Sequence, residues 1–94
     1  MSKLEIVRMR AKEQGIQGDI HISDNPKKKF YIVRPGSYHR IYFGATGYDD
    51  FLDHKNPVRR ENYLKRAKGI RKADGSLAWL DPDSPNFYAV RLLW

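Results

Sequence analysis

The spacing of the apolar side chains predicts a small α+β domain, and its first element is a helix. Over residues 2–14, Leu4, Val7 and Ala11 recur at helical spacing, and Gly15 follows as a helix stop. The apolar stripe is narrow, which is usual for a helix that lies on a sheet. We therefore expect this helix to cover the chain's own sheet. The alternative is an arm that docks on a neighbouring molecule.

Two strands are predicted where aromatic and β-branched residues concentrate, over residues 30–33 and 38–43. Pro35 and Gly36 lie between them and favour a tight turn, because proline fixes φ and glycine accepts a positive φ. Residues 20–22 can add an edge strand with both of its isoleucines on one face. The pattern thus predicts a two- or three-stranded antiparallel sheet.

A basic run, residues 27–29, precedes the first of the two long strands and follows a turn signal at residues 24–26. Three lysines in a turn can contact an anion. They can also keep an edge strand from pairing with other chains. We expect a solvated loop here.

The second long strand carries a candidate binding surface. Tyr38, Arg40 and Tyr42 are two residues apart, and alternate residues of a strand share a face. Two tyrosines and an arginine can stack on nucleic-acid bases or enter a protein interface. Ordinary cross-strand packing, with the arginine over a tyrosine ring, accounts for the same pattern. Both interpretations stay open at this point.

The segment after the sheet offers no recognised catalytic or metal motif. Residues 44–47, GATG, lack the order of a phosphate-binding loop, and their glycines are expected to permit a sharp turn. Calcium-loop spacing and a second nearby histidine are both missing, so no metal site is predicted. We expect the carboxylates to lie at a helix N-terminus, with one of them paired to a nearby arginine. The residues concerned are Asp49, Asp50, Asp53 and His54.

The strongest helix signal is Asn56 followed by Pro57, an N-cap residue and a proline at the first helical position. The predicted helix covers residues 57–68 and ends at Gly69. Its inner side is predicted to hold Val58, Tyr63, Leu64 and Ala67.

Positive charge concentrates around this helix. Residues 55–72 contain eight basic side chains and a single acidic one, and the rest of the chain is balanced, so this segment accounts for the net charge of +7. Such a concentration favours an anionic partner, although a solvated basic face is the simpler alternative. The candidate binding residues are Lys55, Arg59, Arg60, Lys65, Arg66, Lys68, Arg71 and Lys72.

The C-terminal part begins as a turn-rich loop, residues 73–83, in which the apolar residues 77–80 can plug the core. Ser84 and Pro85 repeat the N-cap and first-position signal, which predicts a short helix over residues 85–93. The final Leu-Leu-Trp is costly to leave in water. We expect the last turn to fold back onto the strands. The alternative is that Trp94 anchors in another subunit.

Length and composition agree with one domain over residues 1–94, with 1–15 as an N-terminal helix or arm and 28–94 as the core. With 40% hydrophobic residues the chain is not of the disordered class. The absence of cysteine excludes a disulfide scaffold and a cysteine-ligated zinc site. No apolar run is long enough to predict a membrane span, and the N-terminus does not resemble a secretory signal. We expect no cofactor, no metal, no small-molecule substrate and no catalytic activity.

Taken together, the motifs resemble a small family of uncharacterised proteins from large double-stranded DNA viruses of eukaryotes and some phages. The family pattern is F-G-A-x-G-Y-x-D-F, then H-K-x-x-x-R in a basic helix that carries a tyrosine, then a final L-L-W. The chain departs from it where Arg66 is followed by Ala67, since the family often has an Arg-His pair there. The matching residues are Phe43, Gly44, Ala45, Gly47, Tyr48, Asp50, Phe51, His54, Lys55, Arg59, Tyr63, Leu92, Leu93 and Trp94.

The resemblance implies a virus-encoded protein that is built into the particle and lies inside the host cell during assembly. It implies no established activity. We therefore expect a structural virion component, a minor capsid or cement protein that binds the major shell protein. The alternative is a basic module that binds nucleic acid without sequence preference, with phosphates on the basic residues and bases on the tyrosines of the second strand. A nuclease that uses His54 with Asp50 or Asp53 lacks a convergent set of metal ligands.

Overall fold

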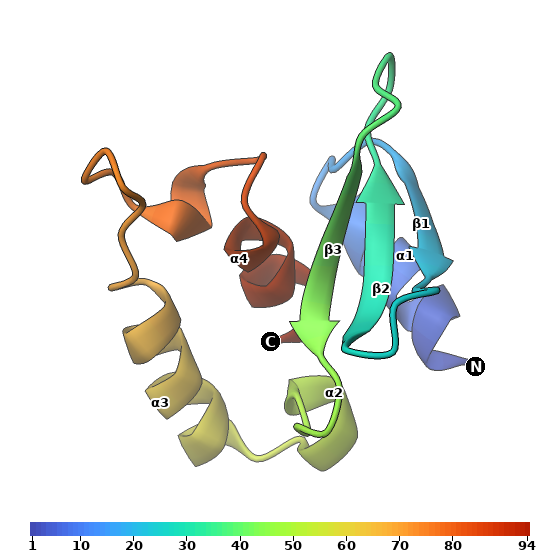
Figure 1. Cartoon of the computed structure of the whole chain (residues 1–94). Helices are drawn as coiled ribbons and strands as arrows, with labels where there is room; N and C mark the ends of the chain where they lie inside the picture. The colour runs from blue at the N-terminus through green and yellow to red at the C-terminus, as the bar shows by residue number, and fades with distance from the viewer.

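The computed structural model describes residues 1–94 and shows one antiparallel sheet with the N-terminal helix and the C-terminal helical segment packed on one face, while the basic helix stands apart from it (Figure 1). The sheet has the order β1-β2-β3, formed by Asp19–Ile22, Lys28–Val33 and Arg40–Ala45. The predicted α+β class is confirmed, with three strands. The helical elements are α1 (Lys3–Glu13), α2 (Phe51–His54), α3 (Pro57–Ala67), the 3₁₀ turn η1 (Ala78–Leu80), α4 (Pro85–Tyr88) and the π-helix η2 (Ala89–Leu93).

The core lies on one face of the sheet, where apolar residues of the three strands line up across the register. Ile20, Ile32 and Ile41 are direct partners on β1, β2 and β3. Phe30 pairs with Phe43 one step further along, with ring centroids 5.9 Å apart. All five side chains are buried. This face needs a cover, because its apolar area would otherwise remain in water.

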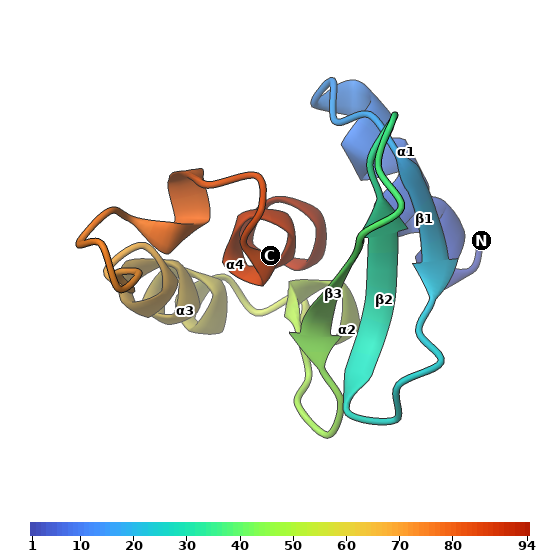
Figure 2. The ribbon, with the colours of Figure 1, turned by 45° about the horizontal axis from the view of Figure 1, so that its top comes forward.

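The N-terminal helix supplies half of that cover, as predicted. The Ser2 side chain caps α1 by accepting a hydrogen bond from the backbone N–H of Glu5 at 3.2 Å. Val7 and Ala11 are buried in the core cluster. The guanidinium of Arg8 donates to the backbone oxygen of Ile20, which ties α1 to β1. The helix therefore packs on the chain's own sheet rather than projecting as an arm (Figure 2).

The C-terminal segment supplies the other half. Ser84 caps α4 with Pro85 at the first position, and the helix continues into the π-helix Ala89–Leu93. Leu92 and Leu93 are buried against the sheet, which confirms that this turn folds back onto the strands. β3 comes so close that a Cβ on Gly44 would lie 2.7 Å from Leu93 Cδ1. No helix combines the length and the apolar character needed to span a membrane.

The strand boundaries correct two predictions. β3 begins at Arg40 because the hairpin connection occupies residues 34–39, so Tyr38 is fully exposed in that loop. Lys28 and Lys29 belong to β2, where Lys28 pairs with Ala45, so the solvated loop predicted there was wrong for these two residues. Ile20 and Ile22 alternate on β1 and so share a face as predicted, but Ile22 ends the strand and is 67% exposed.

The first prediction tests the C-terminal cover. Leu93→Ala should lower the free energy of unfolding by about 2–5 kcal/mol, because it leaves a cavity under β3. Leu80→Ala is the matched control, since Leu80 is 54% exposed and its truncation should change stability by less than about 0.5 kcal/mol. Urea denaturation followed by circular dichroism measures both. Deletion of residues 92–94 should unfold the isolated chain. Equal unfolding midpoints for the two leucine variants would contradict this account.

Candidate functional site: a basic, aromatic-lined cleft beside α3

The basic helix begins where predicted and does not lie on the sheet. The Asn56 side chain accepts hydrogen bonds from the backbone N–H groups of Val58 and Arg59, at 3.0 and 3.3 Å, with Pro57 at the first helical position. Figure 1 shows α3 standing apart from the strands. Ala67 is buried as predicted, but Val58 is 65% exposed. The inner position assigned to Val58 was wrong, because no sheet surface lies beneath that end of the helix.

Contacts from the C-terminal segment hold α3 in place. The Tyr63 and Trp94 rings are stacked nearly parallel, with centroids 3.9 Å apart and 9° between their planes. Nε of Arg60 donates to the backbone oxygen of Trp94 at 2.7 Å. Nδ2 of Asn86 donates to the backbone oxygen of Ala67 at 2.8 Å. Trp94 and Asn86 thus hold α3 against the C-terminal segment. A cleft remains between the helix and the body of the domain.

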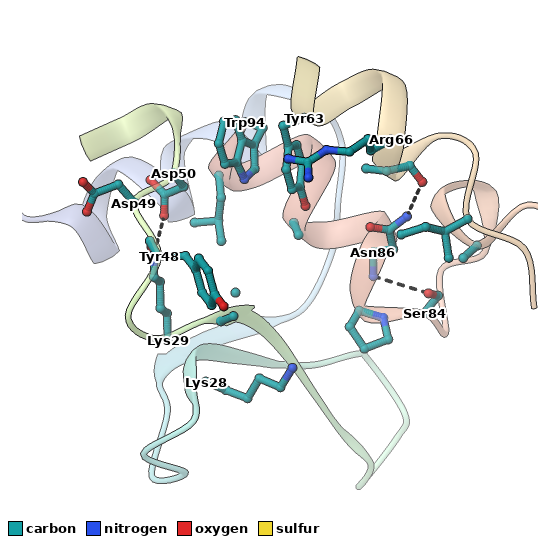
Figure 3. A pocket seen from close by; sticks show the side chains of 18 of the residues that line it. Lys28, Lys29, Tyr48, Asp49, Asp50, Tyr63, Arg66, Ser84, Asn86 and Trp94 are labelled. Atoms are coloured by element: carbon teal, nitrogen blue, oxygen red, sulfur yellow. Dashed lines mark hydrogen bonds and ion pairs between the residues drawn. The ribbon is translucent and has the colours of Figure 1, made fainter. Parts of the chain in front are cut away.

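The cleft has a volume of about 890 Å³, and α3 forms one wall (Figure 3). The side chains on this wall are Arg59, Asn62, Tyr63 and Arg66. Their positions are i, i+3, i+4 and i+7, which puts them on one face of the helix. The charged stripe of α3 therefore faces an open space rather than the core.

The other walls come from segments distant in the sequence. Lys28 and Ala45 line the cleft from the neighbouring strands β2 and β3. Ala89 and Leu93 of the π-helix add an apolar surface, and Tyr48 lines it from the loop after β3. The site therefore combines an apolar surface with aromatic and cationic side chains.

Most of the charge around the cleft is positive and unpaired. No carboxylate lies within ion-pair distance of Lys28, Arg59 or Arg66. Asp49 is exposed at the rim, without a cation of its own. The buried Asp50 also lines the cleft, but cations neutralise it. The cleft thus presents a net positive surface.

The cluster around Asp50 joins three elements. Its carboxylate is buried and lies 2.8 Å from Lys3 Nζ and 2.9 Å from Lys29 Nζ. Asp53 accepts from Lys3 at 2.9 Å and from the backbone N–H of Asp50 at 3.1 Å, which caps α2. The predicted helix N-terminal position is confirmed for Asp50. The predicted pairing with an arginine was wrong, because the cations that contact these carboxylates are Lys3 of α1 and Lys29 of β2.

The pKa of Asp53 follows from these contacts. Partial burial acts to raise it, but the hydrogen bonds from Lys3 and from the Asp50 backbone, with the nearby charge of Lys29, outweigh burial and lower the pKa to about 2. The same cluster raises the pKa of Lys3, where the two carboxylates outweigh the effect of burial. The cluster is therefore a charged tether between α1, β2 and α2.

The structure divides the other basic residues that the sequence grouped together. Lys55 is exposed and ends α2 in a left-handed conformation with φ 53°. Lys65 lies 3.5 Å from Glu61, and Lys68 lies over the Trp79 ring at 4.9 Å. Arg71 and Lys72 belong to the turn after α3. Arg71 bonds to the backbone oxygen of Gly75, and Lys72 lies 2.6 Å from Asp81. These two are less available to a partner than the residues of α3.

The other predicted binding surface, Tyr38, Arg40 and Tyr42, is not a single surface in the structure. Arg40 and Tyr42 take part in ordinary cross-strand packing. The Arg40 guanidinium lies 4.6 Å from the centroid of the Tyr31 ring, and the rings of His21 and Tyr42 each lie 5.3 Å from that ring. The Tyr42 hydroxyl donates to Asp24 at 2.7 Å, and Arg40 pairs with the same carboxylate at 3.1 Å. Tyr38 does not join this group, and Asp24 neutralises the arginine.

The histidine of the nuclease hypothesis is held in a structural position. His54 Nδ1 accepts a hydrogen bond from the backbone N–H of Asn56 at 2.9 Å. Its ring lies between those of Phe51 and Trp94, at 6.1 and 5.2 Å. The structure contains no group of three histidine, aspartate or glutamate side chains that could hold a metal ion.

The sequence interpretation considered residues 27–29 as an anion contact but expected a solvated loop, and it assigned no binding role to Tyr48 or Asn62. The helical spacing of Arg59, Asn62 and Arg66 could have indicated that Asn62 shares a face with the two arginines. Nothing in the sequence indicated that Lys28, about thirty residues earlier, faces the same cleft.

Residues 18–67 match the model of a family of unknown function, DUF5754. The match covers more than half of the chain, so the chain belongs to this family. The matched span runs from β1 to the end of α3, whereas the segment that fastens α3 lies after it. No curated protein and no solved structure is significantly similar to the chain.

The second prediction concerns acid stability. A carboxyl whose pKa falls from an ordinary 3.8 to about 2 on folding stabilises the fold above about pH 4, and this stabilisation is lost as the pH falls towards about 2. Asp53→Asn should lower the thermal midpoint at pH 7 and reduce its further fall between about pH 4 and pH 2. Asp49→Asn, which removes an unpaired carboxylate nearby, is the control and should keep the parent pH profile. Parallel profiles for the parent and Asp53→Asn would refute the tether.

Proposed function

We propose that this chain is a non-enzymatic nucleic-acid-binding protein that uses the basic surface of α3 and the adjoining cleft. One observation carries the proposal: the excess positive charge of the chain gathers on α3 and the residues that flank it, 55–72, which contain a single acidic side chain. Arg59 and Arg66 are exposed and have no acidic partner. Unpaired cations gathered on one helix are the electrostatic footprint of a protein that meets phosphates.

The rest of the molecule supports this interpretation by contrast. Arg34 pairs with Asp83, and Arg40 pairs with Asp24. Lys3 and Lys29 are bound to the carboxylates beside α2. Ion pairing therefore offsets much of the charge outside α3. An anionic macromolecule that approaches the protein would be oriented toward α3 by this asymmetry.

Aromatic rings beside the cations favour nucleic acid over a simple anion. Tyr48, Tyr63 and Trp94 all line the cleft that the arginines of α3 border. Proteins that bind single strands without sequence preference combine a positively charged groove with aromatic side chains on which bases stack. By contrast, the carboxylates of a hydrolytic site are not free here, because Asp50 and Asp53 are held by lysines. A binding role needs neither group.

The third prediction tests this role by its salt dependence. The protein should be retained on single-stranded DNA at low salt, and affinity should fall steeply between about 50 and 200 mM salt. Replacing Arg59 and Arg66 together by Gln should lower the affinity and reduce the slope of log K against log salt by roughly 1.4, since each phosphate contact on a single strand contributes about 0.7.

The matched control removes two charges elsewhere. Lys12 on α1 and Arg40 on the outer face of the sheet are replaced together by Gln, which gives the same net charge as the double arginine variant. This control should keep nearly the parent slope. Equal losses in the two double variants would mean that α3 is not the contact surface. No retention on DNA or RNA at low salt would remove the proposed function.

The resemblance to viral proteins favours a second candidate, a minor capsid or cement protein that binds the major shell protein. The same basic surface would then meet acidic faces of the shell. The fourth prediction is that purified particles contain this protein at a copy number that matches the symmetry of the shell, measured by quantitative mass spectrometry. Particles that lack the protein would exclude this candidate. A substoichiometric protein that leaves with the genome when particles are opened would favour nucleic-acid binding instead.

A further inference from the structure

We infer that the cleft beside α3 is a site for one unpaired nucleotide of a single-stranded nucleic acid. In this arrangement the base stacks on Tyr48, and the flanking phosphates meet Lys28, Arg59 and Arg66. The inference rests on the proposed function and adds to it the class of ligand, the residues that hold it and a preference for single strands over duplexes.

The first argument is size and access. A volume of about 890 Å³ lies within the usual range for sites that enclose small molecules, roughly 300–1,000 Å³, and is ample for a nucleotide. The cleft face of α3, with Tyr63 and Arg66, is directed toward the body of the domain (Figure 3). The bases of a duplex are paired and stacked, so none of them can enter the cleft without being flipped out of the helix. The cleft therefore selects a single extruded base.

The second argument is the unused ring of Tyr48. This side chain is 76% exposed and makes no contact with another aromatic ring. Its backbone is held, because Lys29 Nζ donates to the Tyr48 oxygen at 2.5 Å. Figure 3 shows Tyr48 across the cleft from Tyr63 and Trp94. A tyrosine on a fixed backbone, facing a pair of stacked rings, provides a surface on which a flat base can stack.

The third argument is the distribution of charge. Arg59 and Arg66 are seven residues apart, or about 10 Å along the helix axis, so they can contact phosphates on either side of one nucleotide. Lys28 reaches the cleft from β2, on the opposite wall. Asp49, the one unneutralised carboxylate at the rim, disfavours phosphate near its own position. The backbone of the strand is therefore directed along α3.

A fourth feature allows contact with the edge of the base. Asn62 lies between the two arginines on the same helix face, and its side chain makes no hydrogen bond within the protein. A carboxamide offers both donors and acceptors, so it can pair with any base. The site is thus expected to discriminate weakly between sequences.

The test compares two exposed tyrosines on two DNA forms. Fluorescence anisotropy measures the binding of parent, Tyr48→Ala and Tyr38→Ala proteins to a labelled oligothymidylate and to a duplex of the same length. Tyr38 is the matched control, because it is fully exposed in the hairpin loop at the other end of β3. Tyr48→Ala should weaken single-strand binding about ten-fold, the usual effect of removing one stacking platform, and leave duplex binding unchanged. Tyr38→Ala should change neither.

A second readout places the ligand in the cleft. The chain has two tryptophans, so Trp79→Phe leaves Trp94 as the only one, and Trp94 lines the cleft. Oligothymidylate should change the fluorescence of this variant at the concentrations that saturate the anisotropy signal.

The experiment distinguishes failure of the proposed function from failure of the cleft site. No binding of either DNA form would overturn the proposed function. Salt-dependent binding of both forms with equal affinity, equal behaviour of the Tyr48 and Tyr38 variants, and an unchanged Trp94 signal would overturn the cleft site and leave the proposed function standing.

Discussion

The arrangement of this protein depends on covering the single apolar face of its sheet. α1 covers one part and the C-terminal π-helix covers the other, with Leu92 and Leu93 buried under β3. Because Trp94 directly follows Leu93, the burial of Leu93 also places Trp94 beside α3, where it stacks on Tyr63. The same packing that completes the core therefore sets the position of the basic helix.

That position explains why a helix with an apolar side does not lie on the sheet. The apolar face of the sheet is covered by α1 and the C-terminal segment. α3 therefore packs against that segment instead, through Tyr63 and Ala67. Between these contacts its side chains face open space. A helix that would close a larger core in another protein here forms the wall of a cleft, where Arg59 and Arg66 stay exposed.

Charge is organised in two different ways in this molecule. Around Asp50 a buried carboxylate is compensated by two lysines, and this cluster joins α1, β2 and α2. A buried ion pair that loses one partner is strongly destabilising, so such a cluster holds these elements in one arrangement. On α3, Arg59 and Arg66 are exposed and have no carboxylate within ion-pair distance. The first arrangement holds the fold together, and the second leaves positive charge exposed to solvent.

The local elements were determined by the sequence, because their signals act over a few residues. Caps and prolines at Ser84–Pro85 and Asn56–Pro57 set the starts of the two helices, and helical spacing identified Val7 and Ala11 as core. The concentration of charge over residues 55–72 was likewise visible without a structure. Only the tertiary structure decided which side chains meet. It separated Tyr38 from Arg40, paired Asp50 with lysines rather than an arginine, and brought Lys28, Tyr48 and Arg66 to one cleft. These contacts join residues far apart in the chain, and their geometry depends on how the sheet is covered, which no local pattern encodes.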